Sequence, residues 1–173
     1  MYTYSDILIL VLLSNEPMHG YEIKKRVEQI LSGSVSLNNK VLYPALKRFE
    51  EMKAVEREVV RQEGKPDRHI YRITDHGLEL MQMLLQNSSA EILRNSAEFL
   101  VRVSLFALIE PEARLEILRT RAEIVSKKIA HTQEMRRLAQ ENRADAFAEE
   151  VIAFNEQQDR RELEWIESLM RKI

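Results

Sequence analysis

The residues from Asn38 to Glu50 predict one helix with two chemically different faces. Apolar side chains recur at helical spacing on one face, at Leu42, Ala45, Leu46, Phe49 and Met52. The opposite face carries hydrogen-bond donors, at Asn39, Lys40, Tyr43 and Lys47. A helix that packs by one face and presents donors on the other is typical of a recognition helix, which reads the major groove of DNA.

A β-hairpin is predicted directly after this helix. Residues 55–60 alternate like a strand, and residues 70–73 are typical of the returning strand. The segment 64–68 lies between them, and its turn-forming and basic residues predict the tip of the hairpin. A recognition helix followed by such a hairpin is the element order of a winged helix.

Four motifs in this half of the chain resemble the N-terminal domain of the PadR family of transcriptional regulators. They are His19-Gly20-Tyr21-Glu22-Ile23, Leu42-Tyr43-Pro44-Ala45-Leu46, Gly64-Lys65-Pro66-Asp67-Arg68 and Tyr71-Arg72-Ile73-Thr74-Asp75-His76-Gly77. The resemblance covers residues 1–85 closely. It covers the rest in outline, as the long paired helices of the PadR-like proteins with the larger C-terminal domain. It implies a winged helix-turn-helix that binds DNA, and a repressor.

One position departs from the family's pattern. The family usually has glycine after the recognition helix, whereas this chain has Met52-Lys53-Ala54-Val55. A left-handed helix end costs more without glycine, so the helix is expected to end differently and to alter the approach of the wing, but not the fold.

The other helices of the first domain follow from apolar spacing and from residues that start or stop a helix. The first helix spans residues 4–14, is almost wholly apolar and is expected to be central; Thr3 or Ser5 caps it and Pro17 ends it. A second helix begins near Gly20 and leads to a turn at residues 32–36. Thr74 is the expected cap of a fourth helix that runs to about residue 87.

The second half of the chain predicts long paired helices. One helix is expected over residues 90–109, one starts at Pro111, and a last one runs from the break at 142–145 to about residue 172. The domains are therefore predicted as 1–87 for DNA binding and 88–173 for dimerisation. The fold class is mainly α with a small β-hairpin wing: an N-terminal winged helix-turn-helix and a C-terminal antiparallel helical dimerisation domain.

A seam of apolar residues at three- and four-residue spacing predicts assembly. The last helix has apolar ends and a polar middle at residues 155–161, which suits packing against two different surfaces, one of them in the partner of a dimer. The residues predicted for the dimer interface are Leu115, Leu118, Ala122, Val125, Ile129, Phe154, Trp165, Ile166 and Leu169.

The residues predicted to contact DNA belong to the second helix, the recognition helix and the wing. They are Tyr21, Asn38, Asn39, Lys40, Tyr43, Lys47, Lys65 and Arg68. Each also has a plainer interpretation: a helix cap for either asparagine, packing for either tyrosine, and a solvated charge for each cation. Glu50 and Glu51 would repel phosphate, so contacts are expected in the N-terminal half of the recognition helix.

The net charge of the chain argues against DNA binding, whereas the local distribution of its cations favours it. The chain carries a net charge of −2, and residues 1–86 hold twelve Lys and Arg against twelve Asp and Glu, which argues against a strongly basic footprint. However, the cations Lys40, Lys47 and Arg48 cluster on the recognition helix, and Lys65, Arg68 and Arg72 on or beside the wing. DNA binding is therefore expected to be modest and strongly dependent on salt.

Composition excludes several other classes. The chain has no cysteine, and its four histidines lack ligand spacing, so no metal or cofactor is expected. The apolar run at residues 7–13 is too short to span a bilayer, and no Lys or Arg precedes it as in a secretory signal, which favours the cytoplasm. Catalytic motifs such as a P-loop or a nucleophile elbow are missing, so an enzyme is not expected.

The predicted function is sequence-specific binding of double-stranded DNA by a homodimer on a palindromic operator, as a transcriptional regulator. The alternative is a winged-helix module that binds proteins, which the neutral charge and the long C-terminal helices would suit. Trp165 is expected to anchor the core or the interface. Because some PadR-like proteins bind aromatic or planar ligands between subunits, a small aromatic effector beside it is the other interpretation.

Overall fold

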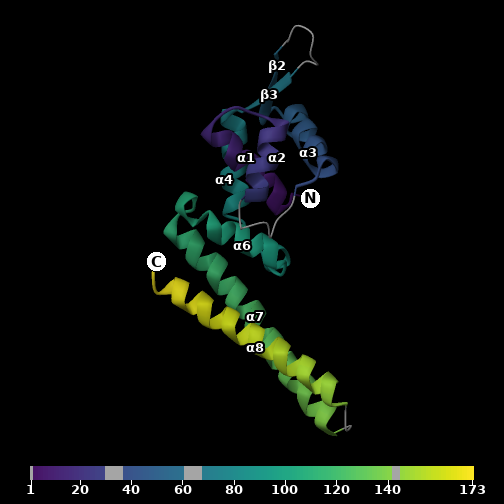
Figure 1. Cartoon of the computed structure of the whole chain (residues 1–173). Helices are drawn as coiled ribbons and strands as arrows, with labels where there is room; N and C mark the ends of the chain where they lie inside the picture. The colour runs from purple at the N-terminus through teal and green to yellow at the C-terminus, as the bar shows by residue number, and fades with distance from the viewer. Residues whose placement is uncertain (1, 30–36, 61–67, 142–144) are drawn as a thin grey trace. The chain divides into compact units, whose positions relative to one another are not determined.

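The structure of the protein, a computed structural model, describes residues 2–29, 37–60, 68–141 and 145–173 of the 173-residue chain. The chain forms two compact units: Met1–Asn87 with Leu100–Ile109, and Ser88–Phe99 with Glu110–Ile173. Figure 1 shows short helices and a small sheet in the first unit and two long helices in the second. The division of the sequence into domains at residue 87 stays a prediction.

The first helix, α1 (Tyr4–Asn15), is the centre of the first unit. Residues 5–13 are all buried, and α2, α3, α4 and β3 pack around the helix. Thr3 caps it, and the Asp6 carboxylate accepts a hydrogen bond from the Thr3 backbone N–H at 2.8 Å. The prediction of a buried first helix is confirmed.

Helices α2 (Gly20–Gln29) and α3 (Asn39–Glu51) pack against α1 and against each other. The side chains predicted for the inner face of α3 are buried at Leu42, Ala45, Leu46 and Phe49, whereas Met52 is 37% exposed. Pro44 lies inside α3 and has no amide hydrogen to offer the carbonyl of Lys40. The turn predicted at residues 32–36 lies outside the described residues.

The wing is part of a three-stranded antiparallel sheet with the order β1-β3-β2. Strands β2 (Val55–Val60) and β3 (Arg68–Ile73) form the predicted hairpin, with Val55 opposite Ile73. Strand β1 (Met18–His19) was not predicted; it pairs with Tyr71 and Ile70 of β3 and is too short to show an alternating pattern. This pairing fixes the start of α2 to the wing.

The recognition helix ends in a left-handed residue although no glycine is present. Lys53 has a φ of 59°, the Lys53 N–H donates to Glu50 O at 3.0 Å, and the Ala54 N–H donates to Phe49 O at 2.8 Å. These are the two hydrogen bonds of a Schellman helix end. The expectation that the helix would end differently is therefore wrong, because lysine adopts the conformation that glycine usually supplies.

Helix α4 (Asp75–Leu85) begins against this helix end. Thr74 caps α4 by accepting from the Gly77 N–H at 3.1 Å, as predicted, and its hydroxyl donates to Lys53 O at 2.7 Å. A Cβ at Gly77 would lie 2.1 Å from Ala54 O. Only glycine allows α4 to approach the backbone after α3 this closely.

The single helix predicted for residues 90–109 is wrong. The structure has α5 (Ala90–Leu93), α6 (Ser96–Ser104) and the 3-10 turn η2 (Phe106–Leu108). The Asn95 side chain accepts from the Ala97 N–H at 2.9 Å, which starts a new helix at that point.

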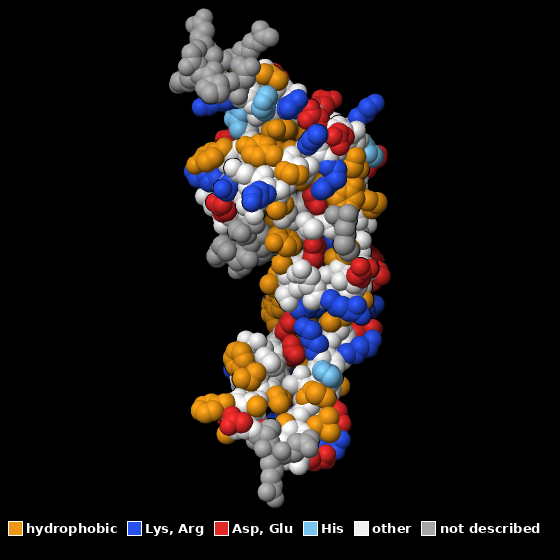
Figure 2. All heavy atoms as spheres, turned by 90° about the vertical axis from the view of Figure 1, so that its right-hand side faces the viewer, with side chains coloured by type: hydrophobic (Ala, Val, Ile, Leu, Met, Phe, Trp, Pro, Cys, Tyr) orange, Lys and Arg blue, Asp and Glu red, His pale blue; other side chains and the backbone are white. Residues whose placement is uncertain are grey.

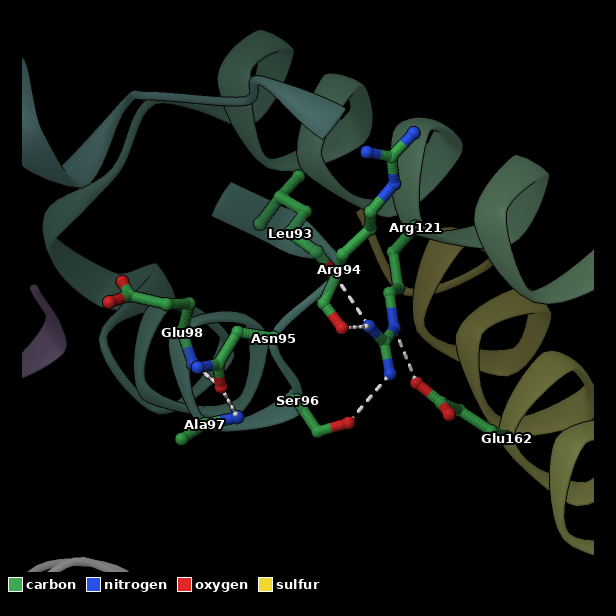
Figure 3. A network of polar contacts seen from close by, with 8 residues as sticks. All are labelled: Leu93, Arg94, Asn95, Ser96, Ala97, Glu98, Arg121 and Glu162. Atoms are coloured by element: carbon green, nitrogen blue, oxygen red, sulfur yellow. Dashed lines mark hydrogen bonds and ion pairs between the residues drawn. The ribbon is translucent and has the colours of Figure 1, made fainter. Parts of the chain in front are cut away.

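The break between α5 and α6 is stabilised by Arg121, which is fully buried (Figure 3). Its guanidinium donates to Leu93 O at 2.6 Å, to Arg94 O at 3.0 Å and to Ser96 Oγ at 2.9 Å, and it forms an ion pair with Glu162 at 2.7 Å. One arginine therefore satisfies the carbonyls that α5 leaves unpaired at its end and holds α8 to the same point.

Helices α7 (Pro111–Glu141) and α8 (Ala146–Met170) lie side by side (Figure 1). Asp145 caps α8 by accepting from the Phe147 N–H at 2.8 Å. The polar middle of α8 at residues 155–161 is exposed or half-buried except at Glu156, which is buried and accepts from Arg160 at 2.7 Å and from Gln133 at 3.3 Å. A paired charge thus replaces apolar packing at this level of the two helices.

Among the described residues, no helix combines the length and the apolar character that crossing a bilayer requires.

Candidate nucleic-acid interface

The outer face of α3 carries polar side chains in its N-terminal half. Asn38 is the N-cap, and its side chain accepts from the Val41 N–H at 3.1 Å. Asn39 and Lys40 follow in the first turn and are exposed. Because the first amides of a helix point outward at its N-terminus, this end of α3 is suited to a phosphate or a base edge.

Lys47 lies further along α3 and is engaged by a neighbour. Its Nζ is 3.8 Å from Glu51 Oε1, and both side chains are largely exposed. A solvent-exposed pair of this kind is weak, so Lys47 can exchange Glu51 for another anion at small cost.

A groove of about 720 Å³ opens beside α3 and joins α2, α3 and β3. Its lining residues are His19, Gly20, Tyr21, Glu22, Lys25, Arg26, Gln29, Tyr43, Arg68, His69 and Tyr71. Three of the predicted DNA contacts, Tyr21, Tyr43 and Arg68, come together here from three different elements. Tyr21 is 75% exposed and Tyr43 is 48% exposed, so neither ring is part of the core.

The close approach of α2 and α3 places Tyr43. A Cβ at Gly20 would lie 3.1 Å from Tyr43 Cε1 and 3.3 Å from its hydroxyl oxygen, so the ring rests on the glycine at the start of α2. The wing is tied to the same corner, because His19 Nδ1 is within 3.0 Å of His69 O. These contacts pre-organise the groove before any ligand arrives.

Tyr71 forms the inner wall of the groove. The residue is buried, and this burial is the main cause that raises the pKa of its phenol, with Arg57 acting in the opposite direction. Arg57 also forms an ion pair with Glu50 at 3.1 Å. The phenol of Tyr71 therefore stays neutral.

Two cations of the groove were missed by the sequence analysis. Lys25 and Arg26 are exposed on α2, and Arg26 forms an ion pair with Glu16 at 2.6 Å. Lys25 follows Tyr21 by four residues, which places both on one face of α2, and this spacing could have revealed it.

Arg48 belongs to α3, as the sequence indicated, but its charge is paired inside the chain. Its guanidinium pairs with the buried carboxylate of Asp6 and lies 5.4 Å from the Phe49 ring centre. Arg48 therefore joins α3 to the start of α1, and it does not belong to the outer donor face.

Two predicted contacts belong to the wing, namely Lys65 and Arg68. Arg68 is exposed at the start of β3, whereas Lys65 lies outside the described residues. Figure 2 shows the basic side chains of the first unit scattered among apolar and acidic ones, in keeping with its even charge balance. Within the described ranges, no three His, Cys, Asp or Glu side chains gather as metal ligands would.

The residues predicted for the dimer interface divide into three groups by exposure. Leu118, Val125, Ile129 and Ile166 are buried within one chain, where α7 packs on α8 and α5. Leu115, Ala122 and Leu169 are half-buried. Phe154 and Trp165 keep 58% and 38% of their surface exposed, although Trp165 also packs edge-on against Phe99 at 6.0 Å. Their role in a dimer stays a prediction.

Comparison with known proteins identifies the first unit. The profile of the transcriptional regulator PadR-like family matches residues 9–83. A PadR family transcription regulator from Clostridium difficile is 31% identical, over 46% of this chain and 81% of its own, with a TM-score of 0.41. No curated protein sequence matches.

Two further solved structures are similar over nearly the whole chain. The smu.1604c protein of Streptococcus mutans is 24% identical over 98% of this chain and 99% of its own, with a TM-score of 0.47. Bacillus subtilis PadR in complex with operator DNA is 17% identical over 96% and 97%, with a TM-score of 0.45. The profile match over the winged helix, together with the identity to the Clostridium difficile regulator, shows that this chain belongs to the PadR-like family of transcriptional regulators.

Proposed function

We propose that this protein is a DNA-binding transcriptional repressor that acts as a homodimer on a palindromic operator, in the cytoplasm and without catalysis. The observation that carries the proposal is the groove in which Tyr21, Tyr43 and Arg68 meet beside the exposed N-terminus of α3. A tyrosine hydroxyl and an arginine can bind phosphate on either side of a helix whose first turn meets the base edges.

The two ends of α3 have different roles in this proposal. Asn39 and Lys40 lie where the helix would enter the major groove, so they supply contacts to base edges. Tyr21, Lys25 and Arg68 lie around the groove; the two cations neutralise phosphates of the DNA backbone, and the Tyr21 hydroxyl donates a hydrogen bond to one. Affinity then comes mainly from the second set of residues and sequence preference from the first.

Dimerisation is supported by an exposed apolar face near the start of α8. Phe147, Val151 and Phe154 follow each other at four- and three-residue spacing and are 81%, 60% and 58% exposed. Figure 2 shows apolar side chains protruding from the part of the second unit that holds the start of α8. A second copy would cover this face, and two recognition helices about 34 Å apart would match a palindrome.

The test is fluorescence anisotropy on the intergenic DNA upstream of the gene, with excess unrelated duplex, at about 50 and 200 mM salt. We expect binding that resists the competitor, decreases steeply with salt, and saturates at two chains per duplex. Asn39→Ala with Lys40→Ala should reduce discrimination between operator and competitor. Lys65→Ala with Arg68→Ala should weaken binding to both and flatten the salt dependence.

Unchanged operator binding in both double variants would show that the assigned surface is wrong. Loss of binding in the presence of competitor, with no retention on heparin at low salt, would favour the alternative of a protein-binding winged helix.

A further inference from the structure

The second unit carries a cationic groove that the proposed function does not use. It has a volume of about 360 Å³ and lies between α5 and α7. Its lining residues are Ala90, Arg94, Thr120, Glu123, Ile124, Lys127, Lys128 and His131. Three cations, one histidine and one carboxylate therefore line a hollow of a size typical of small-ligand sites.

These cations are not used in ion pairs inside the chain. Among the described residues, Arg94, Lys127 and Lys128 have no carboxylate within the 4.0 Å of an ion pair. Elsewhere on α7, Arg121, Arg136 and Arg137 each have a carboxylate partner within that distance. Within the described part of the chain, Arg119 is also exposed without such a partner, but it lies alone outside the groove, whereas the three cations at the groove lie together.

The spacing along α7 places the groove away from the packed face of that helix. Thr120, Ile124, Lys127, Lys128 and His131 follow each other at helical spacing and form one stripe. The buried residues of α7 are Ile117, Leu118, Arg121, Val125 and Ile129, and their stripe lies about a third of a turn around the helix. α8 can therefore pack on α7 without filling the groove.

The Arg121 network fixes the other wall of the groove. Arg121 holds the carbonyls of Leu93 and Arg94, which locks the end of α5 against α7. In Figure 3 the Arg94 side chain points away from the network that its own carbonyl joins. The backbone of Arg94 is therefore fixed, and the Arg94 guanidinium is available to the groove without a change in that backbone.

We propose that this groove binds a small amphipathic anion. A carboxylate or phosphate head would pair with Arg94, Lys127 and Lys128, and a short apolar body would lie on Ile124, Ala90 and the lysine stems. A nucleic acid fits less well, because the hollow is small, part of its floor is apolar and Glu123 lies among its walls.

The experiment is a titration of the full-length protein, without DNA, followed by NMR of the isoleucine methyl groups. The probes are sodium octanoate, octanol and inorganic phosphate. We expect octanoate to shift the Ile124 methyl signal, and not that of Ile117, with a dissociation constant of about 1 mM or below, as suits a ligand of this size. Octanol lacks the charge and phosphate lacks the apolar body, so both should bind more weakly.

The groove variant is Arg94→Ala with Lys127→Ala, and the matched control is Arg119→Ala with Lys172→Ala. The control also removes one arginine and one lysine from exposed positions of the same unit, outside the groove. Octanoate affinity should fall about tenfold in the groove variant, because two charge-assisted contacts are lost, and should stay unchanged in the control.

Three results would overturn the proposal: no shift at Ile124, equal loss of affinity in both variants, or octanol binding as tightly as octanoate. A groove variant that loses affinity for DNA, in a protein that does not bind octanoate, would assign these cations to nucleic acid instead. Because the titration contains no DNA, its outcome is independent of the proposed function.

Discussion

Lys53 adopts a backbone conformation that favours glycine, at the point where the recognition helix gives way to the wing. Its φ of 59° lies in the left-handed region, where a side chain with a Cβ is disfavoured by about 1 kcal/mol or more. The strain is maintained by the Schellman hydrogen bonds and by Thr74, whose hydroxyl donates to Lys53 O. The strained backbone of Lys53 therefore lowers the stability of the folded protein, at the residue that sets the direction of the hairpin.

The substitution Lys53→Gly should stabilise the protein by about 0.5–1 kcal/mol, because relief of the strain exceeds the extra entropy of glycine in the unfolded chain. Urea unfolding followed by far-UV circular dichroism measures this change. Lys53→Ala removes the same charge but keeps a Cβ, so it should give little or no gain. Equal stabilisation by both variants would mean that charge, and not the backbone, is the cause.

At the scale of helices, Arg121 joins four segments of the second unit. It binds the end of α5, the start of α6 and Glu162 of α8 from a fully buried position on α7. A buried charge with all its partners in place contributes little net stability, but removing one member leaves the others unpaired.

Arg121→Ala should therefore destabilise the second unit by about 3–5 kcal/mol. Trp165, the single tryptophan, packs on Phe99 in this unit, so its fluorescence during urea unfolding reports the loss. The control is Arg119→Ala, two residues away and exposed, which should change stability by less than about 0.5 kcal/mol. If Arg121→Ala lost as little stability as Arg119→Ala, the Arg121 network would not be needed for the stability of the second unit.

Glu156 makes the pairing of α7 and α8 sensitive to acid. The hydrogen bond from Arg160 is the main cause that lowers the pKa of this carboxyl below its ordinary value of 4.5. A group with a lowered folded pKa stabilises the protein above its unfolded pKa, and this contribution is lost as the pH falls through the folded value. The stability of the two helices should therefore decrease below about pH 4.5.

Comparison of unfolding at about pH 7 and pH 3 tests this coupling, again through Trp165. In Glu156→Gln the loss of stability between the two pH values should be smaller than in the wild type. Glu164→Gln removes an exposed carboxylate of the same helix and should keep the wild-type dependence. Identical pH dependence in all three proteins would exclude Glu156 as the cause.

Elements with a long apolar period could be predicted from the sequence, whereas those formed by single polar contacts could not. The inner face of α3 and the burial of α1 follow from side-chain spacing, and both are confirmed. The break between α5 and α6 depends on Arg121, which is 27 residues from Arg94 in the chain. The pairing of Arg48 with Asp6 spans 42 residues, so no local pattern could show that this cation has a carboxylate partner within the chain.

In the candidate interface, too, the sequence predicted single residues but not how the fold brings them together. Sequence predicted Tyr21, Tyr43 and Arg68 as separate contacts, and the fold brings them to one groove. Strand β1 produces this arrangement, since two residues paired with β3 fix the start of α2 beside the wing. A pairing of two residues leaves no periodic signal.

At the scale of the whole molecule, we propose that the first unit recognises DNA and that the second unit associates two chains. The two assignments are linked, because a single winged helix with an even charge balance offers few cations to the backbone. Two copies on one operator double the number of phosphate contacts, which compensates for the modest charge of each.

Hydrogen–deuterium exchange of the full-length protein, with and without operator DNA, tests the central claim most directly. The account predicts slower exchange on DNA in three segments that border the groove, namely residues 18–25, 38–43 and 68–71. Hydrogen exchange in the part of α3 after Lys47 should change little when DNA binds. Protection confined to α7 and α8, with the groove segments unchanged in a DNA-bound protein, would contradict the assignment of this groove to DNA.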